Sequence, residues 1–120
     1  MNTRVEKKNN VDIAVIESDD IILRSPDSAL SLLSKVRSES GSSRLVLFES
    51  SISKDFFNMV GMYAYDAQQM VANQGIRVAV VGSFEGVNAY TLRQFDYEQK
   101  PDAAIFLAES EEQALERLSR

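Results

Sequence analysis

The fold is decided by the stretch from Arg44 to Gly82, which reads RLVLFESSISKDFFNMVGMYAYDAQQMVANQGIRVAVVG. Two short apolar runs, Arg44–Phe48 and Arg77–Val81, lie near its ends and are typical of buried strands. Between them, residues 56–73 repeat apolar side chains at helical spacing, and Gly75 then stops the helix. This pattern predicts a β-α-β unit with two parallel strands.

Parallel strands place the loops that follow them at one edge of the sheet, where open α/β sheets usually carry their sites. We therefore expect functional residues in Glu49–Asn58, in Gly82–Asn88, or on the outer face of the helix between them. One stripe of that helix should face the sheet, and it consists of Val60, Tyr63, Ala64, Ala67 and Val71. A second stripe consists of Met59, Met62 and Tyr65. It is either the edge of the core or a partner surface.

The composition excludes several kinds of chemistry. The 120 residues contain no cysteine and no histidine, which excludes disulfides, thiolate metal sites, a cysteine nucleophile and a histidine base. The net charge of −5 disfavours non-specific binding to nucleic acid. No apolar run approaches the roughly 20 residues of a membrane helix, and the polar start does not resemble a secretory signal. We expect a cytoplasmic protein of one domain, residues 11–120, after a flexible N-terminus at residues 1–10.

The rest of the chain alternates strands and helices. The alternation of apolar residues in Val11–Glu17 predicts a half-buried strand at or near a sheet edge. Ile21–Leu23 is expected to form the second arm of a hairpin. Ser25 and Pro26 mark a helix start. A further helix is expected over Val87–Tyr97, with Ala89, Leu92 and Phe95 pointing inward. Ala103–Ala108 then reads as a buried strand, and Ser110 with Gln113 as the capping box of a last helix that packs through Ala114, Leu115 and Leu118.

This order, β-β-α-β-α-β-α-β-α with a mixed sheet and a parallel centre, resembles the STAS domain of sulphate transporters and anti-sigma-factor antagonists. The landmarks are the VLFES strand, the helix ending at Gly75, the VAVVG strand and the closing AIFLAESEEQALERL. Phe56-Phe57 and the segment Ala79–Phe84 resemble more closely a small bacterial family, domain of unknown function 4180. The resemblance implies an α/β, STAS-like single domain with a regulatory or binding role.

In STAS switch proteins a phosphorylated Ser or Thr begins the long helix. The corresponding position here is Asn58-Met59-Val60-Gly61, which keeps the glycine but has no hydroxyl. The resemblance therefore implies docking without that switch. Ser50, Ser51 and Ser53 lie upstream and are interpreted as turn and cap residues.

The candidates for catalysis are few. Gly82–Gly86 lacks the spacing and the lysine of a phosphate-binding loop and is interpreted as a strand-to-helix turn. The carboxylates considered as acid and base are Asp19-Asp20, Glu49 with Asp55, and Glu85. Asp19-Asp20 is interpreted as a solvated turn, and a structural role as an ion pair or cap is favoured for Glu49. Lys54 is the remaining candidate base. We expect no catalysis, no cofactor and no metal.

The sequence instead favours a protein-binding domain that docks through the start of the long helix and the adjoining loops. Apolar side chains would supply the affinity and acidic ones the steering. The expected contact residues are Ser53, Lys54, Asp55, Phe57, Asn58, Met59, Met62, Tyr65, Phe84 and Glu85.

Two other functions stay open. Small size and acidity also suit an immunity or antitoxin protein that covers a basic toxin, for instance a nuclease. The Gly82–Asn88 loop could instead form a small-ligand or nucleotide site. The expected partner is a regulatory protein or a toxin, and a homodimer is also open.

Overall fold

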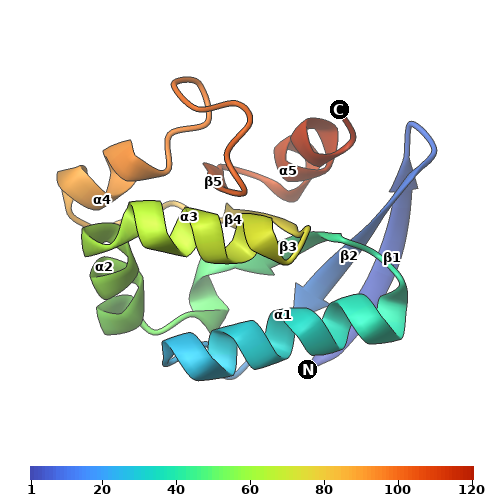
Figure 1. Ribbon diagram of the computed structural model, residues 1–120, viewed down its shortest axis with the longest axis horizontal. Coiled ribbons are helices and arrows are strands. Elements are labelled where there is room, and N and C mark those ends of the chain that lie inside the picture. Colours follow the sequence, from blue (N-terminus) through green and yellow to red (C-terminus); the bar gives the residue numbers. More distant parts are fainter.

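The computed structural model describes residues 1–120 and places a twisted, mixed sheet of five strands at the centre of the molecule (Figure 1). In spatial order the strands are β1 (Asn2–Lys8), β2 (Val11–Glu17), β3 (Arg44–Phe48), β4 (Arg77–Val81) and β5 (Ile105–Ala108). β1 runs antiparallel to β2, and β2 to β5 are parallel. The predicted α/β class and parallel centre are confirmed.

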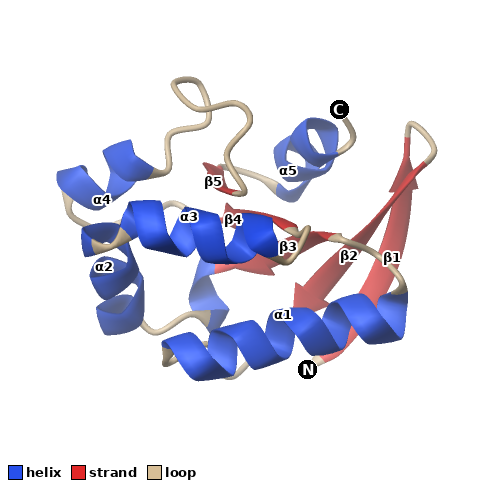
Figure 2. Ribbon diagram, in the orientation of Figure 1, coloured by secondary structure: helices blue, strands red, loops and turns tan.

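Helices lie on both faces of this sheet (Figure 2). They are α1 (Pro26–Ser40), the short 3-10 helix η1 (Glu49–Ser51), α2 (Lys54–Met62), α3 (Ala64–Asn73), α4 (Ala89–Gln94) and α5 (Glu111–Leu118). None of them combines the length and the apolarity that crossing a membrane requires.

Alternate residues of each strand enter two separate cores. Ala14 and Ile16 of β2 pack in the larger core, beneath α1, α2 and α3. Ile13 and Val15 point the other way, into a smaller core completed by Ala114 and Leu118 of α5. β2 is therefore buried on both faces, and the prediction of a half-buried strand there is wrong.

The N-terminal residues form a strand rather than a mobile tail. Residues 2–8 pair with β2 along their whole length, and Asn9 and Asn10 turn the chain with φ of 53° and 65°. Two consecutive left-handed residues make the turn that suits a tight hairpin, and asparagine tolerates that conformation. The expected hairpin arm at Ile21–Leu23 is wrong, because that segment makes only a single bridge between Leu23 and Ile52.

Arg4 attaches this N-terminal strand to the rest of the domain. Its guanidinium donates to Glu17 on β2 at 2.7 Å, to Glu6 at 2.5 Å, and to Glu111 on α5. The hydrogen bonds to Glu17 and Glu111 raise the pKa of Arg4. A charged residue that looked like part of a solvated tail thus links β1, β2 and α5.

The long helix predicted between β3 and β4 is two helices. α2 ends at Met62, and Tyr63 breaks the helix with φ −119° and ψ 35° before α3 leaves in a new direction (Figure 1). Ala64 and Val71 are buried as predicted, but Tyr63 is 61% exposed instead of facing the sheet. The helical spacing of apolar residues predicts the wrong orientation for Tyr63, because the helix is interrupted at this residue.

Gly61, one residue before the end of α2, lies directly against Thr91 of α4. A methyl group on Gly61 would lie 2.2 Å from Thr91 Oγ1, and Thr91 is fully buried. Only glycine allows the two helices to come this close.

The predicted helix ends are largely correct. The Ser25 hydroxyl accepts from the Ser28 N–H, and Pro26 is the first residue of α1. At α5 the Ser110 hydroxyl accepts from the Gln113 N–H as expected, but the Gln113 side chain accepts from the Glu109 N–H instead of closing the capping box.

The last third of the chain is less regular than predicted. The helix expected over Val87–Tyr97 is only Ala89–Gln94, and the strand expected from Ala103 begins at Ile105. Ala89 is exposed, whereas Phe95 is buried as predicted.

Gln68 on α3 closes the edge of the sheet at β5. Its amide donates to the Ile105 carbonyl at 2.8 Å and accepts from the Ile105 N–H at 2.7 Å. One side chain thereby satisfies both backbone groups that a neighbouring strand would otherwise bind, and it covers an edge open to aggregation.

We expect Gly61→Ala to lower the free energy of unfolding by about 1–3 kcal/mol, because the added methyl group overlaps Thr91. Alanine is otherwise the better helix former by about 1 kcal/mol, so a net loss reports the contact with α4. Urea denaturation measures the change, and Met62→Ala on the next, exposed residue is the control. A Gly61→Ala protein as stable as the parent would contradict the packing described here.

We expect Gln68→Ala to cost about 1–3 kcal/mol of stability, because it leaves both backbone groups of Ile105 without a partner. Gln68→Glu keeps the shape but removes the donor to the Ile105 carbonyl, so it should also destabilise at neutral pH. Thermal unfolding of both variants is compared with that of Gln69→Ala, which changes an exposed neighbour. Equal melting temperatures for all three would refute the role of Gln68.

Candidate functional site

The carboxyl ends of β3 and β4 meet in a polar cleft of about 390 Å³. This is the sheet edge at which the sequence predicts a site. The cleft is lined by Ile21, Glu49, Ser50, Ile52, Lys54, Phe57, Ser83, Glu85 and Val87. Of the expected contact residues, it brings together Lys54, Phe57 and Glu85.

Glu49 has a structural role in this cleft. Its Oε1 accepts from the Phe84 N–H at 2.9 Å and so holds the loop after β4. Phe84 has φ 59°, a conformation that is strained for a bulky residue. Gly82 lies so close that a methyl group there would be 2.4 Å from the same oxygen. The Glu49 carboxylate thus holds a strained loop, which agrees with the expected structural role of Glu49. Its partner is a backbone N–H.

Two of the expected contact residues are core residues. Phe57 and Phe84 are only 7% and 9% exposed, and their rings stack with centroids 5.8 Å apart. Phe57 also packs against Phe95, with centroids 6.0 Å apart. Burial leaves little of either ring for a partner to touch, although Phe57 lines the polar cleft, so the contact of these two residues with a partner stays a prediction.

The polar residues expected at the start of the helix occupy several environments. The Ser53 hydroxyl accepts from the Phe56 N–H and caps α2. Lys54, Asp55 and Glu85 are exposed. Asn58 is half-buried, and its side-chain oxygen has no hydrogen-bond partner.

The second stripe of the long helix is exposed. Met59, Met62 and Tyr65 are 37%, 69% and 76% exposed, and Tyr63 joins them because of the helix break. These four side chains are called the α2–α3 surface below. Of the two interpretations of the stripe, the core edge is wrong. Tyr63 was missed because an uninterrupted helix would have turned it inward.

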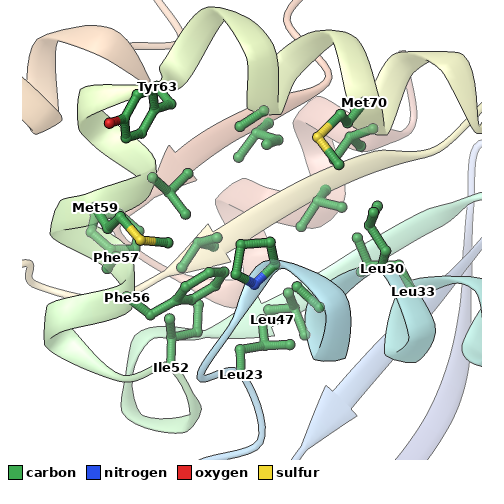
Figure 3. A pocket seen from close by; sticks show the side chains of 18 of the residues that line it. Leu23, Leu30, Leu33, Leu47, Ile52, Phe56, Phe57, Met59, Tyr63 and Met70 are labelled. Atoms are coloured by element: carbon green, nitrogen blue, oxygen red, sulfur yellow. The ribbon is translucent and has the colours of Figure 1, made fainter.

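An apolar cavity of about 340 Å³ lies behind this surface, between α1 and the α2–α3 pair (Figure 3). Eighteen of its 20 lining residues are hydrophobic. Leu47, Val78 and Val80 of the sheet contribute to its lining, and Met59 and Tyr63 belong both to the cavity and to the α2–α3 surface. The sequence carries no signal for this cavity, because its size depends on how far apart the helices lie.

No group of three or more Asp or Glu side chains lies close enough together to hold an ion. In the polar cleft, the groups able to act chemically are Glu49, Lys54, Glu85 and the hydroxyls of Ser50 and Ser83. A ligand site at Gly82–Asn88 stays a prediction.

We expect Glu49→Ala to destabilise the protein by about 1–3 kcal/mol, because the Phe84 N–H loses its charged acceptor. Glu49→Gln keeps an acceptor oxygen and should retain most of that stability. Glu85→Ala, an exposed carboxylate in the same cleft, is the control. Denaturant midpoints for the three variants test this, and equal losses for Ala and Gln would show that the hydrogen bond to Phe84 does not hold the loop.

Comparison with known proteins places the chain in a family. Neither the search of curated proteins nor that of solved structures found a match. The family described as Domain of unknown function (DUF4180) matches residues 8–118, which is nearly the whole chain. On this match, the chain belongs to that family.

Proposed function

We propose that this chain is a cytoplasmic, non-catalytic domain that binds another protein through the α2–α3 surface. The observation that carries the proposal is the exposure of Met59, Met62, Tyr63 and Tyr65 over one short stretch of chain. Single exposed apolar residues are ordinary, whereas a group of them marks an interaction site.

The chemistry of these side chains supports a protein partner. Tyrosine and methionine are enriched at protein interfaces, where tyrosine combines a large apolar ring with a polar end and methionine adapts its shape. Exposed Asp55 and Asp66 outnumber Lys54 on the same two helices. This charge would attract a basic partner and speed its association.

We further propose that the domain acts in the manner of STAS domains, by docking to a partner protein. This proposal is supported by the resemblance and by the mixed sheet with a parallel centre. The position of the usual switch, Asn58–Gly61, has no hydroxyl, and Gly61 serves the contact with α4. We therefore propose constitutive docking at this surface rather than docking controlled by phosphorylation at Asn58–Gly61.

The net charge of −5 favours one alternative, an immunity or antitoxin protein that covers a basic toxin. Such a protein could use the same surface, because large apolar side chains would supply affinity and the acidic surroundings would steer the toxin. The identity of the partner separates the two functions.

We expect Met62→Glu and Tyr65→Glu each to reduce recovery of the partner at least tenfold, because a charge placed in the centre of an interface must be desolvated. Quantitative affinity capture from host lysate measures the recovery. Val5→Glu, at an exposed apolar residue on β1, is the control, and it should bind as the parent does.

All three substitutions lie at exposed side chains, so the proteins should fold, and circular dichroism checks this. A regulatory partner lost only from the α2–α3 variants supports the proposed function. A basic toxin lost in the same way supports the immunity alternative. Equal recovery with all variants contradicts docking at this surface.

A further inference from the structure

The cavity between α1 and the α2–α3 pair reaches from the surface to the sheet (Figure 3). Its lining includes Leu47, Val78 and Val80, which are buried strand residues. Leu33 contributes from α1 and Met70 from α3. Because both strands and helices line it, the cavity extends from its open mouth inward to the larger core.

Two of the helices that line this space, α1 and α3, each contribute an alanine to it. Ala29 on α1 and Ala67 on α3 both line the cavity and are half-buried. Protein interiors are usually close-packed, and a larger side chain at either position would fill much of the space. An occupant that binds this space only in the folded protein would stabilise the folded state.

The volume sets the size of the occupant. An apolar cavity of about 150 Å³ is enough to bind benzene, so 340 Å³ suits a molecule of about a dozen non-hydrogen atoms. This size lies at the small end of ordinary ligand pockets. An interfacial helix of a partner would need a longer groove, with apolar contacts repeated over several turns.

The polar groups at the cavity set the charge of the occupant. Asp66 is the only charged residue in the lining, and Tyr63 supplies the only side-chain hydroxyl. Both residues are exposed, so these groups lie at the mouth rather than in the depth. No lysine or arginine lines the cavity to pair with an anion, which disfavours carboxylates such as fatty acids.

We infer that this cavity binds a mainly apolar small molecule of about a dozen non-hydrogen atoms, either uncharged or with one positive group near Asp66. The ligand's apolar part occupies the space between Ala29 and Ala67, and its polar end lies at the mouth. The site is distinct from the Gly82–Asn88 loop and does not depend on a protein partner. Occupation would also touch Met59 and Tyr63, and so alter the α2–α3 surface from behind.

Binding of 1-naphthylamine tests the inference, because its fused rings match the cavity in size and its fluorescence reports an apolar environment. We expect one molecule to bind per chain with micromolar affinity. Ala67→Leu should weaken binding at least tenfold by filling the cavity. Ala72→Leu, on the exposed side of the same helix, should leave binding unchanged.

Ala29→Leu fills the cavity from the opposite wall, so the test does not depend on the folding of one variant. Each filled variant should keep or raise the melting temperature while losing the probe. No binding to the parent protein overturns the inference. So does equal binding by the parent and both filled variants.

The charge preference is tested by displacing the probe with decylamine or decanoic acid, which have chains of equal length. We expect the amine to displace it at roughly tenfold lower concentration, a ratio that corresponds to about 1.4 kcal/mol. Asp66→Asn should abolish this preference, and Asp102→Asn, at an exposed carboxylate outside the cavity, should preserve it. Two results would overturn the proposed role of Asp66 at the mouth. One is a preference for the acid, and the other is a preference for the amine that Asp66→Asn leaves unchanged.

Discussion

The contact between Gly61 and Thr91 leaves no room for a methyl group, so α2 can lie this close to α4 only with glycine at this position. α2 ends one residue later, and α3 begins in a new direction after Tyr63. The first consequence is that Met62, Tyr63 and Tyr65 are exposed. The second is that α2 and α3 both line one side of an apolar cavity whose other side is α1.

Polar side chains hold the backbone around this arrangement in place. Glu49 binds the N–H of Phe84 after β4, Gln68 binds both backbone groups of Ile105, and Arg4 connects β1 to α5. Unpaired backbone groups at these places would cost free energy wherever water is excluded. Glu49, one of the residues considered for catalysis, thus supports the loop after β4.

The sequence predicts the central strands and most helix ends well, because these depend on local chemistry. A short apolar run such as Arg44–Phe48 is typical of a buried strand. Ser25 and Ser110 begin helices and Gly75 follows the end of one, and each does so through backbone only a few residues away. The pair Asn9-Asn10 is also typical of a tight hairpin turn. The strand before it was not predicted, because its charged residues resemble a flexible tail.

What could not be predicted depends on tertiary packing. The backbone of Tyr63 separates α2 from α3, whereas the helical spacing of apolar residues in the sequence continues through this position. Phe57 and Phe84 looked like surface anchors until stacking placed them in the core. Of the expected contact residues, Met59, Met62 and Tyr65 are exposed, whereas the aromatic pair is buried. The cavity beneath it was not foreseen.

The four methionines allow a single direct measurement of this arrangement. Met59 and Met70 line the cavity, whereas Met62 lies on the outer face of α2 and Met1 at the N-terminus. In a methyl NMR spectrum of the protein labelled at methionine, titration with 1-naphthylamine should shift the Met59 and Met70 signals and leave those of Met1 and Met62 in place. Unchanged spectra, or shifts confined to Met1 and Met62, would contradict a ligand cavity behind the α2–α3 surface.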